Sequence, residues 1–175
     1  MQGVMPVRAT GLGGRGVRQG PESGNVYDHF AVIFEYDDGA RCFLTCRQQS
    51  NCSNDNTDYV MGELGTCAVN GWAPSHVITG PNAWQYPTDG PRPNMYQVEH
   101  DELFASIRSG RPINDGTWMA NSTMMSILGR TAAYTGKTLT WDEALASEGA
   151  LGPSHYEMGA LRTPPIARPG ETPFV

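Results

Sequence analysis

One histidine stands among carboxylates, in the segment Glu99-His100-Asp101-Glu102. An imidazole titrates close to neutral pH and responds to nearby charges, so an acidic setting can hold it charged or tune it for acid–base catalysis. His100 is therefore the candidate catalytic residue. The competing interpretation is a solvated, capped start of a helix, which requires no chemistry.

Three further side chains are candidates for substrate binding. Trp84 and Tyr96 could stack on a sugar ring, because an aromatic face offers apolar area to its C–H groups. Packing in a core or an interface is the alternative for both. Arg47 ends a predicted strand before the polar residues 50–58, where its guanidinium could pair with a carboxylate or hydroxyl. An ordinary exposed strand end is the alternative there.

The sequence does not predict a metal site. Asp28 and His29 with Asp55 and Asp58 would be the best set of oxygen and nitrogen ligands, but no spacing makes them converge. The four cysteines do not have the paired C-x-x-C spacing of structural zinc sites. Buried thiols are the expected state of these cysteines.

The stretch GLGGRG, residues 11–16, satisfies the pattern G-x-G-x-x-G of dinucleotide-binding loops. In such a loop the third glycine opens a helix whose N-terminal amides face the pyrophosphate. Residues 20–24, GPESG, follow here and cannot form that helix. A flexible glycine-rich hairpin or loop is expected instead, from which Arg15 and Arg18 could still meet an anion.

Three helices are predicted in the second half of the chain. The first, residues 94–110, opens on a capping Asn94 and ends at a glycine. The second, residues 115–136, repeats apolar residues every three to four positions. The third, residues 140–146, opens on the capping-box pattern Thr-x-x-Glu.

Strand patterns precede these helices. Residues 26–36 and 40–48 are β-branched and aromatic runs on either side of Asp-Asp-Gly, which is typical of a hairpin. If its Asp-Gly pair forms a two-residue turn, Phe34 faces Phe43 and both faces of the hairpin carry apolar side chains. Helices can cover one face, so the other requires a second subunit or another domain.

Strands followed by helices indicate the α+β class, with the helices on one face of the sheet. Short strands are also expected in residues 59–86, before a proline-rich segment. The length of 175 residues favours one domain, placed at residues 1–150. Residues 151–175 are rich in proline and glycine, and an extended tail is expected there.

The charge of the chain limits its partners. A net charge of −6 with only 12 Lys and Arg argues against nucleic acid or an anionic membrane, and favours small molecules or proteins. No apolar run approaches the roughly 20 residues that cross a bilayer. The N-terminus also lacks the apolar core of a signal peptide. The chain is expected to be soluble, and cytoplasmic by default.

Residues 4–150 resemble the C-terminal half of the Gfo/Idh/MocA oxidoreductases. The resemblance is carried by DHFAVIFEYDDGARCFLTCRQ, by DYVMGELGTCAVNG, and by YQVEHDELFASIRSGRPINDGTWMANSTMMSILGRTAAYTGKTLTW. It implies an open, mainly antiparallel sheet that shapes a sugar or polyol site and commonly packs against another subunit. It also implies that NAD or NADP binds to a separate N-terminal Rossmann domain.

The sequence departs from that family in the parts that carry its chemistry. The dinucleotide-binding βαβ unit and the catalytic lysine of a Glu-Lys-Pro motif are missing, and Lys137 lies at a helix end. No Asp-x-x-x-His occurs. The expected function is therefore the substrate-binding and oligomerisation domain of an NAD(P)-dependent sugar or polyol oxidoreductase, with cofactor and lysine supplied by the Rossmann domain. A dimerisation module without redox activity, and a cofactor-independent lyase or isomerase that uses His100, are the alternatives.

Overall fold

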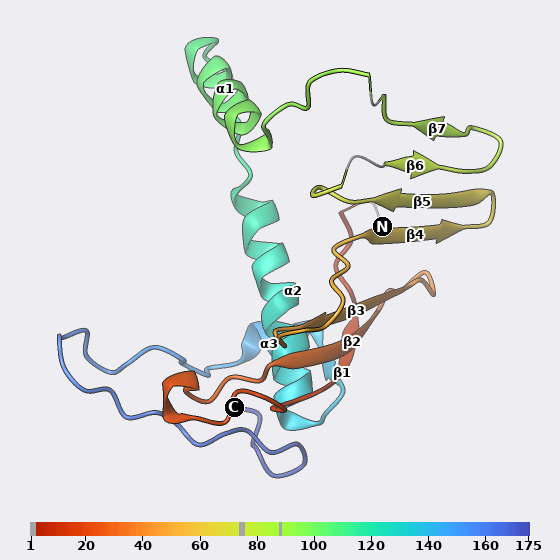
Figure 1. Ribbon diagram of the computed structural model, residues 1–175. Coiled ribbons are helices and arrows are strands. Elements are labelled where there is room, and N and C mark those ends of the chain that lie inside the picture. Colours follow the sequence, from red (N-terminus) through yellow and green to blue (C-terminus); the bar gives the residue numbers. More distant parts are fainter. Residues whose placement is uncertain (1–2, 74–75, 88) are drawn as a thin grey trace. The chain divides into compact units, whose positions relative to one another are not determined.

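The computed structural model describes residues 3–73, 76–87 and 89–175. It has the predicted α+β class, with antiparallel strands in two four-stranded sheets and α-helices in the second half of the chain (Figure 1). The chain forms two compact units, Met1–Ser50 with Asn114–Val175, and Asn51–Ile113. We call these the first and the second unit. The assignment of residues 1–150 to one domain stays a prediction.

The first unit is a four-stranded sheet with helices against one face. Its strands lie in the order β3-β2-β1-β8, and every neighbouring pair is antiparallel. They are β1 (Arg8–Gly14), β2 (His29–Glu35), β3 (Arg41–Arg47) and β8 (Leu139–Thr140). The helical elements are η1 (Pro21–Ser23), α2 (Gly116–Thr135) and α3 (Trp141–Ala146). β8 is an addition to the strands predicted from the sequence.

The hairpin of β2 and β3 has a different register from the predicted one. Phe34 pairs with Cys42 and Ile33 with Phe43, one residue away from the expected pairing. The reason is the turn, in which the N–H of Gly39 donates to the carbonyl of Tyr36 and Gly39 has a φ of 87°. Asp37, Asp38 and Gly39 thus form a three-residue loop that ends on a left-handed glycine.

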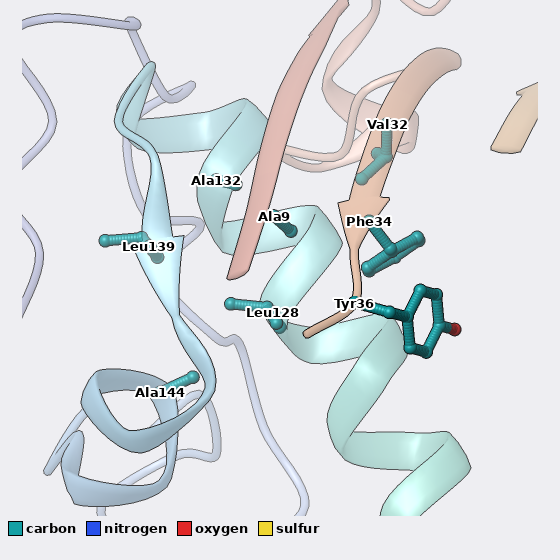
Figure 2. Close-up of a cluster of buried hydrophobic side chains, with 8 residues drawn as sticks. All are labelled: Ala9, Val32, Phe34, Tyr36, Leu128, Ala132, Leu139 and Ala144. Atoms are coloured by element: carbon teal, nitrogen blue, oxygen red, sulfur yellow. The ribbon is translucent and has the colours of Figure 1, made fainter. Parts of the chain in front are cut away.

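The core of the first unit lies between the sheet and the C-terminal half of α2. Figure 2 shows side chains of β1, β2, β8, α2 and α3 converging there. The buried cluster consists of Ala9, Val32, Phe34, Tyr36, Leu128, Ala132, Leu139 and Ala144. The N-terminal half of α2 does not share this burial, since Trp118 and Met119 are exposed.

The glycine-rich stretch is a paired strand over residues 11–14, so of the predicted hairpin or loop the flexible loop is wrong for these residues. These residues belong to β1 and pair with β2. A Cβ on Gly11 would lie 2.8 Å from the backbone nitrogen of Ala133 and 3.0 Å from its Cα. On the helix side, a Cβ on Gly129 would lie 2.9 Å from the ring of Phe34. Glycine at these positions therefore allows α2 to approach the sheet closely.

Local sequence signals fix the ends of the helices. Gly136 ends α2 in the left-handed conformation, and its N–H donates to the carbonyl of Ala132. Thr140 and Glu143 form the predicted capping box at the start of α3. Residues 151–175 contain no helix or strand, and the N–H of Gly170 donates to the carbonyl of Thr135.

The second unit contains the other sheet and α1 (Met95–Arg108). Its strands are β4 (Asp58–Gly62), β5 (Gly65–Val69), β6 (Val77–Ile78) and β7 (Trp84–Gln85), in that spatial order. Asn94 caps α1 as predicted, because its side chain accepts from the N–H groups of Tyr96 and Gln97. No helix in the described residues is long and apolar enough to cross a membrane.

Candidate functional site

The sheet of the first unit has a second face, directed away from α2, which we call the outward face. Alternation along β1, β2 and β3 places four rows of side chains on it, each with one residue from each strand. In strand order these rows are Gly14, His29, Arg47; Leu12, Ala31, Thr45; Thr10, Ile33, Phe43; and Arg8, Glu35, Arg41. The two middle rows are largely apolar and exposed, as the sequence predicted for the second face of the hairpin.

The last of these rows is a charged cluster at one end of the face. Both Arg8 and Arg41 pair with the carboxylate of Glu35, at 2.8 and 2.9 Å. The pKa of Glu35 is held below its ordinary value, mainly by the hydrogen bond from Arg8 and also by the charges of Arg41 and Arg8. Partial burial of the carboxylate opposes this shift. Each charged side chain at this end of the outward face therefore has an ion-pair partner within the cluster.

The opposite end carries the candidate site, which centres on the side chains of Asp28 and His29. Nδ1 of His29 lies 2.7 Å from Oδ1 of Asp28, and the carboxylate is buried while 45% of the imidazole is exposed. A carboxylate can only accept, so Nδ1 carries the proton and the second ring nitrogen, Nε2, is left to exchange protons with a bound molecule. This is the arrangement in which a carboxylate orients a catalytic imidazole.

Asp28 is held by the loop that follows β1. The N–H groups of Gly16, Val17 and Arg18 donate to its carboxylate at 2.7 to 3.0 Å. Burial alone would raise the pKa of Asp28, but these three donors and His29 outweigh it and hold the pKa far below its ordinary value. The carboxylate is thus a fixed anion that orients His29.

Gly14 leaves the exposed edge of the imidazole uncovered. It pairs with His29 across β1 and β2, and a Cβ at position 14 would lie 3.3 Å from both Cε1 and Nε2. Arg47 is the partner of His29 on the other side, across β2 and β3. His29 therefore pairs with a residue without a side chain, Gly14, in β1 and with Arg47 in β3.

The structure gives His100 a backbone partner. Its Nδ1 lies 2.7 Å from the carbonyl oxygen of Tyr96, one turn earlier in α1, and the side chain is exposed. Asp101, next to it in sequence, accepts instead from the side chain of Gln97. His100 and Tyr96 thus share one face of α1. Their predicted roles in catalysis and substrate binding stay predictions.

Trp84 lies in the second unit, half exposed on the short strand β7. Its ring meets that of Tyr86 edge to face at 6.1 Å, and Tyr86 meets His76 in the same way. Trp84 also lines an open hollow of about 390 Å³ beside β6. A half-exposed aromatic ring in a hollow is compatible with sugar stacking, which stays a prediction.

Asp28 and Asp55, which would have belonged to the best set of metal ligands in the sequence, have other partners. Asp28 is occupied by the loop after β1, and Asp55 accepts from the N–H of Thr57 and the hydroxyl of Tyr59. Among the residues that the structure describes, no three His, Cys, Asp or Glu side chains are grouped so that they could hold a metal ion.

Acid should reduce the contribution of Asp28 to stability. Its pKa is lowered by folding, so its contribution to stability is complete above its ordinary pKa of 3.8 and is lost as the pH falls below that value. We expect the stability difference between wild type and Asp28→Asn to be largest near neutral pH and to narrow from about pH 4 downward. Urea unfolding of both proteins between about pH 7 and pH 2.5 measures it. A difference that stays constant over this range would contradict the account.

Solved structures show which proteins share this fold. No protein-family model and no curated protein sequence matches the chain. An aldose-aldose oxidoreductase from Caulobacter crescentus, crystallised with glycerol, aligns with a TM-score of 0.60 at 19% identity, over 79% of this chain and 42% of its own. An oxidoreductase from Agrobacterium radiobacter, in complex with NAD+, L-tartaric acid and magnesium, aligns with a TM-score of 0.57 at 14% identity, over 79% and 44%.

A third structure, an oxidoreductase from Klebsiella pneumoniae, aligns with a TM-score of 0.51 at 16% identity, over 78% of this chain and 44% of its own. All three are oxidoreductases. At these identities the likeness establishes the fold, and this chain spans less than half the length of each of the three proteins.

Proposed function

We propose that this chain is the substrate-binding and oligomerisation domain of an NAD(P)-dependent oxidoreductase that acts on a sugar or polyol, in the manner of the Gfo/Idh/MocA enzymes. The observation that carries the proposal is the shared fold, which covers about four fifths of this chain and less than half of three oxidoreductases. Glycerol, a polyol, and NAD+ accompany two of those structures.

The glycine-rich stretch of this chain does not fit a nicotinamide dinucleotide. Gly11 packs against the backbone of Ala133. The stretch then continues into the loop around Asp28, and no helix long enough for a pyrophosphate site begins there. The proposal therefore assigns the cofactor to a Rossmann domain outside these 175 residues.

The residues of the first unit supply the proton chemistry of the proposed reaction. Oxidation of a secondary alcohol removes a hydride from carbon and a proton from the hydroxyl oxygen. His29 is placed to accept that proton at Nε2, since Asp28 fixes the proton on Nδ1. The fixed charge of Asp28 also stabilises the imidazolium that results. The proposed catalytic histidine, His29, therefore lies at the start of β2.

The outward face supports the oligomerisation part of the proposal. Leu12, Ile33 and Phe43 lie in its two middle rows, with exposed fractions of 74%, 39% and 73%. Apolar side chains that adjoin in this way on a sheet are typical of surfaces that pack against another protein. A second copy of this chain, or the proposed Rossmann domain, would cover them.

A negative charge introduced by mutation on the outward face should dissociate the proposed homo-oligomer. We expect Phe43→Asp to raise the dissociation constant of a homo-oligomer by at least about 100-fold, because an unpaired carboxylate would be buried in the interface. Sedimentation equilibrium of the chain measures this. Met158→Asp, in the fully exposed part of residues 151–175, is the matched control and should leave the assembly unchanged. A wild-type chain that is monomeric at all concentrations would contradict the oligomerisation role.

A dimerisation module without redox activity is the second candidate function, and the same outward face favours it. The two candidates differ in turnover. The complete protein encoded by the gene should reduce NAD+ or NADP+ in the presence of one member of a panel of sugars and polyols, as followed by the absorbance of the reduced nicotinamide. Absence of turnover over the whole panel, together with a stable dimer, would favour the module.

A further inference from the structure

Residues 167–174, which we call the strap, are anchored to the first unit although they contain no helix or strand. The N–H of Gly170 donates to the carbonyl of Thr135 at 2.8 Å. On the other side of this contact, a Cβ on Gly136 would lie 2.9 Å from a ring atom of Pro169. The strap is therefore held against the C-terminal end of α2.

Gly170 gives the strap its shape. It lies in a turn in which the N–H of Thr172 donates to the carbonyl of Arg168 at 2.8 Å, and the N–H of Arg168 donates to the hydroxyl of Thr172 at 2.7 Å. Gly170 has a φ of 86°, in the left-handed region that residues with a Cβ rarely adopt. A β-branched residue at this position would therefore strain the turn.

Tyr27 connects the strap to the candidate site. Its hydroxyl donates to the carbonyl of Ala167 at 2.8 Å, and its N–H donates to the hydroxyl of Tyr134 at 3.1 Å. The rings of Tyr27 and Tyr134 lie 4.4 Å apart, and a Cβ on Gly13 would lie 3.0 Å from the ring of Tyr27. Tyr27 is buried. Both its backbone and its ring are thus fixed, directly before Asp28 in the chain.

We propose that Tyr27 is a positioning residue, which the strap holds in place so that Asp28 keeps the imidazole of His29 oriented to accept a proton. A change in the backbone at Tyr27 would carry the carboxylate of Asp28 away from Nδ1 of His29, which now lies 2.7 Å from it. Proton transfer depends on such geometry. The inference rests on the proposed function for the role of His29 in turnover, whereas the orientation of the imidazole can be measured without turnover.

The tautomer of His29 reports on this orientation. In the wild type, Asp28 should keep the proton of the neutral imidazole on Nδ1, and the 15N signals of labelled histidine at alkaline pH distinguish the two tautomers. His29→Gln assigns the signals. His76 is an internal reference for the opposite tautomer, because its Nδ1 accepts from the N–H of Asn70. We expect Tyr27→Phe to lower the ratio of the Nδ1–H to the Nε2–H form of His29 about 2-fold to 10-fold, the usual effect of one hydrogen bond.

Two glycine variants test the strap itself. A point variant is preferable to removal of the strap, which would also take Phe174 from the core. Gly170→Val should lower the tautomer ratio of His29, and kcat of the complete protein, by the same factor of about 2 to 10, because it acts through the same hydrogen bond. KM should change much less, since no contact to substrate is removed. Gly159→Val is the matched control, because a Cβ there meets no atom within 4 Å, and it should change neither quantity.

The double variant shows whether the strap acts through Tyr27. Gly170→Val should have no further effect on the tautomer ratio once Tyr27 is replaced by phenylalanine. Equal effects in both backgrounds would overturn the positioning role of Tyr27. A wild-type ratio in both single variants would overturn the inference as a whole. A complete protein without turnover would contradict the proposed function instead, and the tautomer ratio would still decide the inference.

Discussion

Replacement of Gly11 by valine is expected to unfold the first unit. A Cβ at this position would lie 2.8 Å from the backbone nitrogen of Ala133 and 3.0 Å from its Cβ, and two further methyl groups cannot be placed. Backbone atoms cannot move aside as a flexible side chain can, so α2 would have to leave β1. Overpacking costs about 1 to 3 kcal/mol even where side chains adjust, and the whole free energy of unfolding of a domain is only about 5 to 15 kcal/mol.

Chemical unfolding followed by circular dichroism measures the effect. Gly11→Ala should lower the free energy of unfolding by about 1 to 3 kcal/mol, and Gly11→Val should leave no cooperative transition for the first unit. Gly159→Ala is the matched control, because a Cβ there meets no atom within 4 Å. A Gly11→Ala protein with the wild-type transition midpoint would show that α2 does not pack against β1 as closely as described.

Loss of the imidazole of His29 should nearly abolish turnover in the complete protein. Glutamine can keep a hydrogen bond to Asp28 but cannot accept a proton, so His29→Gln should lower kcat about 100-fold to 10,000-fold, the usual contribution of general acid–base catalysis. Substrate affinity should change much less, because the amide can still contact a hydroxyl group. Steady-state kinetics at saturating nicotinamide dinucleotide separate the two constants.

The same assay decides between the two candidate histidines. His155→Gln, in the exposed residues 151–175, is the matched control and should keep wild-type turnover. If His100→Gln loses turnover and His29→Gln retains it, the acid–base role belongs to the start of α1, as the acidic sequence around His100 suggested.

Local signals in the sequence predicted the helices well. Asn94, Gly136 and the pair of Thr140 and Glu143 are caps whose partners lie within four residues, so their effect does not depend on the rest of the fold. The hairpin register was missed by one residue, because Asp-Asp-Gly is compatible with a two-residue or a three-residue loop. Only the position of Gly39 in the turn decides between them.

The candidate site depends on contacts between residues that are distant in sequence. Asp28 and His29 are adjacent in sequence, and this spacing alone gives no reason to expect a buried carboxylate that orients an exposed imidazole. The loop at Gly16, Val17 and Arg18 creates that arrangement. The stretch GLGGRG has the pattern of a phosphate loop, but its glycines serve the contact with α2 and the open edge of His29.

Binding of a nicotinamide dinucleotide tests the central claim most directly. Isothermal titration of NAD and of NADP should be carried out on the complete protein translated from the gene and, in parallel, on these 175 residues alone. The account predicts that the complete protein binds one of the two nucleotides with a one-to-one stoichiometry and that the 175 residues bind neither. A complete protein that binds neither nucleotide would contradict the assignment to an NAD(P)-dependent oxidoreductase.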